Sequence, residues 1–114
     1  MTYEFPEELE FFERGFGYSS EYDHEEGQFS FLMDYGTGEK LIFTHSPFGN
    51  NSVSVKLFQG AELVFHIYKE QVTSIAFQAW GREQILRVYL DDDSNNFLVY
   101  FNPKARLKYC EPNM

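Results

Sequence analysis

The fold of this chain is decided by Gln28-Phe29-Ser30-Phe31-Leu32-Met33-Asp34-Tyr35-Gly36-Thr37-Gly38. Over residues 28–35, large apolar side chains recur at every second position, with Ser30 and Asp34 between them. A period of two sends one set of side chains to a buried face and the other set toward solvent. The two glycines that follow are typical of a tight turn. The stretch therefore predicts a half-buried β-strand that leads into a hairpin.

Apolar runs of strand length recur along the rest of the chain, separated by short turn-forming segments. They cover residues 41–44, 52–57, 62–68, 73–79, 85–90, 97–101 and 105–110. No segment between them is long enough to be the crossover helix that parallel strands need. Together with residues 28–35 they predict a mainly β fold, with seven or eight strands in one antiparallel meander sheet curled into a barrel or a sandwich. Residues 86–90 and 97–101 are apolar on both faces, so we expect them at the centre of the sheet.

A short helix is predicted over residues 6–14. Pro6 suits a first helical turn, the glutamates that follow it favour the positive end of the helix dipole, and Gly15 suits the exit. Because so short a helix is unstable alone, it must pack on the rest of the protein. With 114 residues, the chain is predicted to form a single β domain over residues 1–114, with its strands between about residues 28 and 110.

The negative charge is concentrated in the N-terminal third. Residues 1–39 carry eleven acidic side chains and one basic one, whereas residues 40–114 carry seven acidic and eight basic ones, and the formal net charge is −9. A concentrated acidic segment on a small domain is the kind of surface that meets a basic partner. The same charge argues against direct binding to nucleic acid or to an anionic membrane, because both need a positive face.

The candidate partner-binding residues are acids that lie close to aromatic side chains. Carboxylates steer association with lysine and arginine, and an aromatic ring adds contact area at low entropic cost. The alternative interpretation of the acidic loop is a solvated segment that aids solubility. The predicted contact residues are Tyr18, Glu21, Tyr22, Asp23, Glu25, Glu26, Trp80, Asp91, Asp92 and Asp93. For Trp80 a place in the core or at the rim of a barrel is the plainer interpretation, and for Asp91–Asp93 it is a polar hairpin tip.

No residue pattern identifies a catalytic centre. The sequence has no nucleophile elbow and no phosphate-binding glycine loop, and its three histidines lack the close ligand pairs of zinc sites. We therefore predict a non-enzymatic protein without cofactor or bound metal. The single Cys110, together with an acidic N-terminus and no long apolar run, predicts a cytoplasmic protein.

The function predicted from these features is that of an acidic inhibitor, an immunity or antitoxin-type protein that neutralises a basic, nuclease-like toxin by direct binding. Such an inhibitor needs a stable domain, an acidic face and no catalytic groups. The first alternative is a small β-barrel that encloses a hydrophobic small molecule among its aromatic side chains. A mimic of the nucleic-acid backbone and an adaptor that pairs through a sheet edge are further alternatives. The oligomeric state is left open by the sequence.

Overall fold

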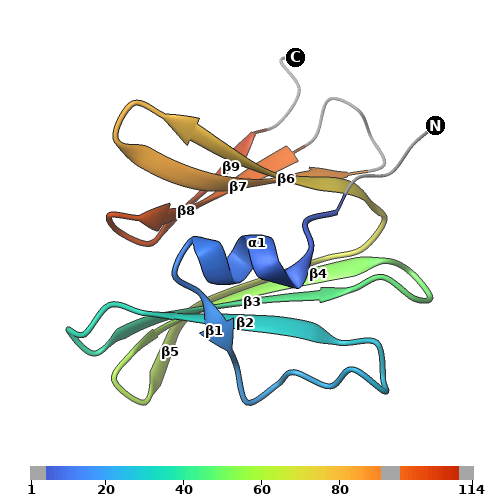
Figure 1. The fold of residues 1–114 in the computed structure, drawn as a ribbon, viewed down its shortest axis with the longest axis horizontal. Coiled ribbons are helices and arrows are strands. Elements are labelled where there is room, and N and C mark those ends of the chain that lie inside the picture. Colours follow the sequence, from blue (N-terminus) through green and yellow to red (C-terminus); the bar gives the residue numbers. More distant parts are fainter. Residues whose placement is uncertain (1–4, 91–95, 111–114) are drawn as a thin grey trace. The chain divides into compact units, whose positions relative to one another are not determined.

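The computed structural model describes residues 5–90 and 96–110 and contains one helix and nine strands (Figure 1). The elements are α1 (Glu8–Glu13), β1 (Gly17–Tyr18), β2 (Phe29–Asp34), β3 (Glu39–Ser46), β4 (Ser52–Gln59), β5 (Glu62–Lys69), β6 (Val72–Trp80), β7 (Glu83–Leu90), β8 (Asn96–Asn102) and β9 (Arg106–Cys110). In the described part of the chain, no helix has the length and apolar character that a membrane crossing requires.

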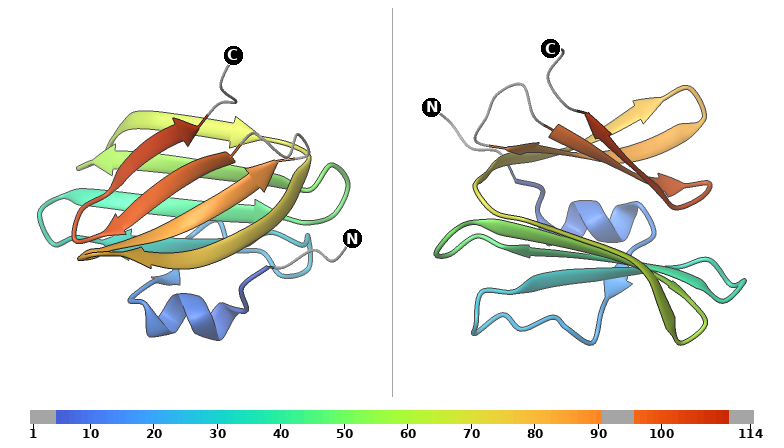
Figure 2. Two further views of the ribbon diagram at one scale, coloured as in Figure 1. Left: turned by 90° about the horizontal axis from the view of Figure 1, so that it is seen from above. Right: turned by 180° about the vertical axis from the view of Figure 1, so that it is seen from behind.

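The strands form two antiparallel sheets, one with the order β1-β2-β3-β4-β5 and one with the order β6-β7-β8-β9 (Figure 2). A mainly β, antiparallel fold with one short helix is thus confirmed. The expectation of a single sheet is wrong, because the strands form two. The consecutive strands β5 and β6 do not pair with each other, and between them Gln71 adopts a left-handed backbone with φ of 62°. Within residues 5–90 and 96–110, neither sheet closes into a barrel. Alternation shows which face of a strand is buried, but it carries no information on where one sheet ends and the next begins.

The contacts divide the chain into two compact units, one formed by residues 7–70 and the other by residues 1–6 and 71–114. The first unit holds α1 and the five-stranded sheet, and the second holds the four-stranded sheet. The core of the first unit is aromatic. Phe31 and Phe43 face each other across β2 and β3, both are buried, and the ring of Phe11 from α1 stacks on Phe31 at a centroid distance of 4.0 Å.

Helix α1 lies within the predicted range 6–14, which confirms that expectation. The Glu7 backbone N–H donates to the Glu10 carboxylate at 2.8 Å, so a group that has no partner inside the helix is satisfied. Gly15, with φ of 97°, ends the helix in the left-handed conformation that glycine adopts at least cost. The burial of Phe11 then supplies the tertiary contact that a helix of this length requires.

In the second unit the two apolar strands are central, as predicted. β7 and β8 are the inner strands of the sheet, and every side chain from Asn96 to Phe101 is buried. The short strand β1 was not predicted from the sequence, because two residues are too few to show an alternating pattern.

Candidate interaction surface

Two predicted contact residues, Tyr18 in β1 and Tyr22 in the segment between β1 and β2, are hydrogen-bonded to Glu8 of helix α1. The phenol of Tyr18 donates a hydrogen bond of 2.7 Å to Oε2 of Glu8, and the phenol of Tyr22 donates to Oε1 of the same carboxylate. The two tyrosine rings lie edge to face with centroids 4.4 Å apart, and Tyr22 also meets Phe29 edge-on. Both hydroxyl groups are therefore engaged within the protein, while the Tyr18 side chain remains 52% exposed.

These hydrogen bonds change the acidity of all three groups. The bonds from Tyr22 and then Tyr18 stabilise the charged carboxylate and lower the pKa of Glu8. In return the Glu8 carboxylate, acting mainly as hydrogen-bond acceptor, raises the pKa of Tyr18 and of Tyr22, because an ionised phenol could no longer donate to it. At neutral pH the cluster therefore carries one negative charge and two neutral rings.

Glu21 forms an ion pair with β4, an inner strand of the five-stranded sheet. Its Oε2 is 3.0 Å from Nζ of Lys56 on β4, and its backbone carbonyl accepts a hydrogen bond of 2.6 Å from the side-chain amide of Gln28. The charge of Glu21 is thus partly offset by Lys56, so this residue contributes less to an acidic surface than the sequence suggested.

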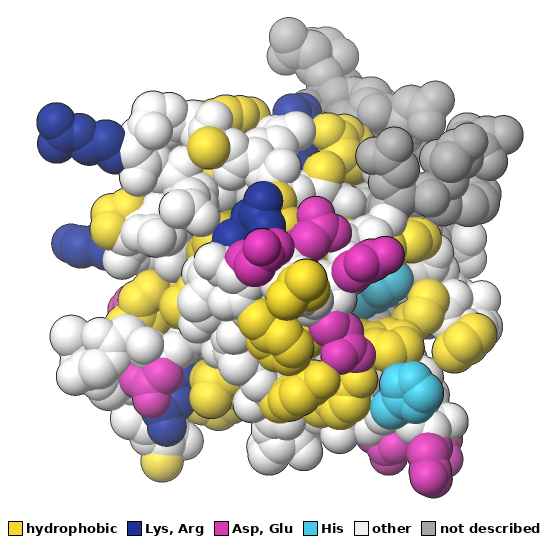
Figure 3. All heavy atoms as spheres, viewed as in Figure 1, with side chains coloured by type: hydrophobic (Ala, Val, Ile, Leu, Met, Phe, Trp, Pro, Cys, Tyr) yellow, Lys and Arg dark blue, Asp and Glu magenta, His cyan; other side chains and the backbone are white. Residues whose placement is uncertain are grey.

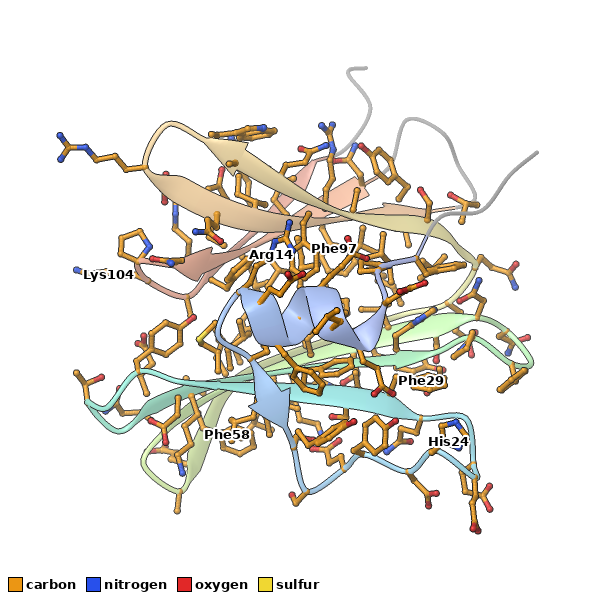
Figure 4. The ribbon with its side chains drawn as sticks, in the orientation of Figure 1. Arg14, His24, Phe29, Phe58, Phe97 and Lys104 are labelled. Carbon is orange, nitrogen blue, oxygen red and sulfur yellow. The ribbon has the colours of Figure 1, made fainter. Side chains whose placement is uncertain are left out.

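The remaining acids of the segment form an ordered turn, which we call the acidic hairpin (residues 23–28). Asp23 and Gln28 exchange two backbone hydrogen bonds of 2.8 Å, and the Glu26 backbone N–H donates to Oδ1 of Asp23 at 3.2 Å. Asp23, Glu25 and Glu26 are all exposed. Figure 4 shows His24 in this hairpin, and in the same view Figure 3 shows acidic side chains gathered beside a histidine at the lower right. The hairpin thus presents three carboxylates to solvent on a hydrogen-bonded turn.

An exposed aromatic ring lies against the acidic hairpin. Phe48, in the turn between β3 and β4, is 74% exposed, and its ring covers Gly27 so closely that a Cβ atom there would lie 2.2 Å from Cδ2 of Phe48. The sheet register explains this contact: Phe29 pairs with His45, so the hairpin before β2 and the turn after β3 meet at the same end of the sheet. Phe48 was not predicted as a contact residue. Its one signal in the sequence is that an aromatic residue stands within the otherwise polar turn 47–51.

Hydrogen bonds hold the neighbouring turn in place. Oε2 of Glu70 accepts from the side-chain amide of Asn50 and from the phenol of Tyr68, both at 3.0 Å. At the base of the turn, Nε2 of His45 lies 2.9 Å from Oδ1 of Asn51. Burial lowers the pKa of His45, so this ring stays neutral at neutral pH. The turn that carries Phe48 is therefore anchored on both sides.

The other predicted contact residues lie elsewhere in the chain. Trp80 ends β6 in the second unit and is 45% exposed, so it is not a core residue, and the guanidinium of Arg87 lies 5.9 Å from the centre of its ring. Asp91, Asp92 and Asp93 lie outside the described residues. Among the residues that are described, no group of three or more His, Cys, Asp or Glu side chains could hold a metal ion.

Comparison with known proteins gives a match in structure only. No protein-family model matches the chain. No curated protein matches it in sequence. A chain of the solved contact-dependent growth inhibition toxin–immunity protein complex from Klebsiella pneumoniae 342 is similar in structure, with a TM-score of 0.78 and 11% sequence identity. The similarity covers 94% of this chain and 95% of that chain. At this level of identity it shows that the two chains share a fold.

Proposed function

We propose that this protein is an immunity-type inhibitor that neutralises a basic, nuclease-like toxin by direct binding. The observation that carries the proposal is the fold that it shares, over 94% of its length, with a chain of a toxin–immunity protein complex. The proposal includes that the protein is not an enzyme. It also places the protein in the cytoplasm, where a single cysteine such as Cys110 stays reduced.

Charge favours the immunity side of such a pair over the toxin side. A nuclease must hold a polyanion and therefore carries positive charge at its site. This chain has a formal net charge of −9, and the unit formed by residues 7–70 carries twelve acidic and four basic side chains. An acidic inhibitor is attracted over long range to the site that the toxin uses for nucleic acid, so its association is fast and its position blocks that site.

We place the contact with the toxin at the end of the five-stranded sheet where the acidic hairpin meets Phe48. The three exposed carboxylates of the hairpin attract lysine and arginine, but exposed ion pairs alone contribute little to affinity. The exposed ring of Phe48, which lies against Gly27 of the same hairpin, supplies apolar area that loses water on binding, which is the usual character of an interface hot spot. Tyr18 and Tyr22 add rings whose hydroxyl groups are already satisfied by Glu8.

The other predicted contacts remain part of the proposal with smaller roles. Glu21 is paired with Lys56, so we expect it to orient the segment more than to attract the toxin. Trp80 is exposed and offers an aromatic contact from the second unit. Asp91–Asp93 add negative charge to that unit.

The test begins with the tagged protein, which is used to capture binding partners from a lysate of its own cells and is then washed with increasing salt. We expect one basic protein in equimolar amount. That protein is next expressed in a laboratory bacterial host with and without this chain. We expect growth arrest by the captured protein alone and normal growth when both are made.

Two results would contradict the proposal. If no basic protein is retained, the acidic surface serves solubility and the inhibitor function is wrong. If expression of this chain alone arrests growth, it belongs to the toxin side of such a pair.

A further inference from the structure

Strand β5 is an open edge of the first sheet. Its residues pair with β4 on one side, from Val53 opposite Lys69 to Gln59 opposite Glu62. On its other side no strand of the described chain is hydrogen-bonded to it, since β5 ends the sheet order (Figure 1). The opposite edge is formed by β1, which has only two residues. Among the described strands, β5 is thus a long edge strand of this sheet, eight residues in length.

The exposed side chains of β5 are largely apolar. Leu63 is 46% exposed, Val64 57%, Phe65 44% and Tyr68 52%, whereas Val53 and Val55 on the adjacent β4 are fully buried. Proteins usually protect a long edge strand with charges, proline or a covering segment, because its unpaired backbone groups can accept another strand. An apolar, unprotected edge is therefore a surface suited to pairing with a further strand.

The charges at the two ends of β5 indicate which kind of strand can pair with it. The strand begins with Glu62 and ends with Lys69, and its middle is apolar apart from His66. Its formal charge is balanced, so it gives no advantage to a strongly basic partner. A second copy that runs antiparallel brings the Glu62 end of each strand to the Lys69 end of the other. A parallel copy in register would instead place like charges side by side.

We propose that two copies of this chain associate through antiparallel pairing of β5, which joins their five-stranded sheets into one continuous sheet. A two-fold axis at Phe65 places this ring against its counterpart and places Leu63 of each copy opposite Ile67 of the other. Such pairing is self-complementary and closed, as in most homodimers. The inference goes beyond the proposed function and does not depend on it, because it concerns the edge strand and not the acidic hairpin.

The test measures the mass of the purified full chain by light scattering and sedimentation over increasing protein concentration. We expect a transition to twice the monomer mass of 13.5 kDa. Phe65→Lys, which puts a charge on the two-fold axis, should leave only monomer. Leu9→Lys is the matched control, because Leu9 on α1 is 63% exposed but lies outside β5, and this variant should still dimerise.

Charged substitutions at one cross-strand pair test the register and the direction of pairing. With the axis at Phe65, Leu63 lies opposite Ile67 of the other copy, so Leu63→Lys and Ile67→Glu should each raise the dimer dissociation constant about fivefold or more, because each places a charge against an apolar side chain in both symmetry-related pairs. The double variant places lysine opposite glutamate in both pairs and should recover part of the lost affinity. The proposal is overturned by a monomer at every concentration, by a dimer that survives Phe65→Lys, or by a double variant that is weaker than both single ones.

Discussion

The two units of the molecule differ in what their surfaces carry. The unit of residues 7–70 has a formal charge of −8, from twelve acidic and four basic side chains, whereas residues 1–6 and 71–114 together have a charge of −1. Of the eight large apolar side chains that are exposed in the described chain, Trp80 alone lies in the second unit. The second unit instead contains β8, in which six consecutive side chains are buried. We infer that the first unit carries the binding surfaces and that the second mainly contributes stability.

The largest effect should come from the core of the second unit. Phe97 is 1% exposed, so Phe97→Ala should lower the free energy of unfolding by about 3–5 kcal/mol. Phe48→Ala, at a ring that is 74% exposed, should change it by less than about 0.5 kcal/mol. Urea denaturation followed by tryptophan fluorescence compares the two. If both variants lost the same free energy of unfolding, the inference that the second unit mainly contributes stability would be wrong.

The same titration tests whether the chain unfolds as the single domain predicted from its sequence. We expect one transition that coincides when it is followed by fluorescence and by circular dichroism. Two separate transitions would show that the two units unfold independently.

The next effect concerns binding. Phe48→Ala should weaken binding to the captured toxin by about 1–2 kcal/mol, mainly through faster dissociation, because a desolvated aromatic contact is lost. Surface plasmon resonance gives the two rate constants. An unchanged dissociation rate would remove Phe48 from the interface.

Two glycine variants separate the position of the Phe48 ring from general backbone strain. Gly27→Ala places a methyl group where the ring now lies, whereas Gly36→Ala meets no atom within 4 Å, and the two glycines have similar φ values of 70° and 74°. Both should lose about 1–2 kcal/mol of stability from the left-handed backbone. Only Gly27→Ala should also speed dissociation from the toxin, and equal dissociation rates for the two variants would contradict this account.

Titration of the Glu8 cluster tests its hydrogen bonds. The folded pKa of Tyr18 and of Tyr22 lies above the ordinary value of 10.0, so their contribution to stability is present below pH 10 and is lost as the pH rises through the folded values. The folded pKa of Glu8 lies below 4.5, so its contribution is present above that pH and is lost on further acidification. In Glu8→Gln, ultraviolet titration should show both phenols ionising at lower pH than in the wild type. Unchanged phenol titration would contradict the hydrogen-bonded cluster.

The smallest effect is expected at the ion pair between Lys56 and Glu21. Both side chains are about a quarter to a third exposed, at 26% and 30%. Lys56→Gln should therefore cost only about 0.2–1 kcal/mol of stability. It should also leave toxin binding nearly unchanged, because the carboxylate that it releases lies outside the acidic hairpin. A loss of several kcal/mol would show that the pair holds the segment before β2 in place.

The sequence was sufficient for local structure because the relevant signals are local. Helix α1 and the eight long strands follow from turn residues and from periodicity, and the central position of β7 and β8 follows from their two apolar faces. The division into two sheets was not predictable, because strands of either sheet show the same alternation. Whether β5 and β6 pair with each other on the two sides of Gln71 depends on long-range contacts that one sequence does not reveal.

The candidate site shows the same limit. The concentration of acids was visible in the sequence, but the pairing of Glu21 with Lys56 joins residues thirty-five positions apart. Phe48 meets Gly27 only because β2 and β3 pair in one particular register. Likewise, Glu8 was assigned to the helix alone, although it accepts hydrogen bonds from both tyrosines.

The central claim is that one end of the first sheet, and not net charge alone, attracts the toxin. The most direct measurement is the association rate with the captured toxin at low and high salt for two variants of equal charge change. Glu25→Gln with Glu26→Gln alters the acidic hairpin. Asp34→Asn with Glu39→Gln alters the opposite end of the same sheet, where Asp34 pairs with Lys40.

We predict that the hairpin variant associates about three- to tenfold more slowly at low salt and depends less on salt, since it loses local steering. The variant at the opposite end should associate at nearly the wild-type rate. Equal slowing of both variants would mean that net charge alone governs association, and no slowing of either would contradict the acidic hairpin as the toxin-binding surface.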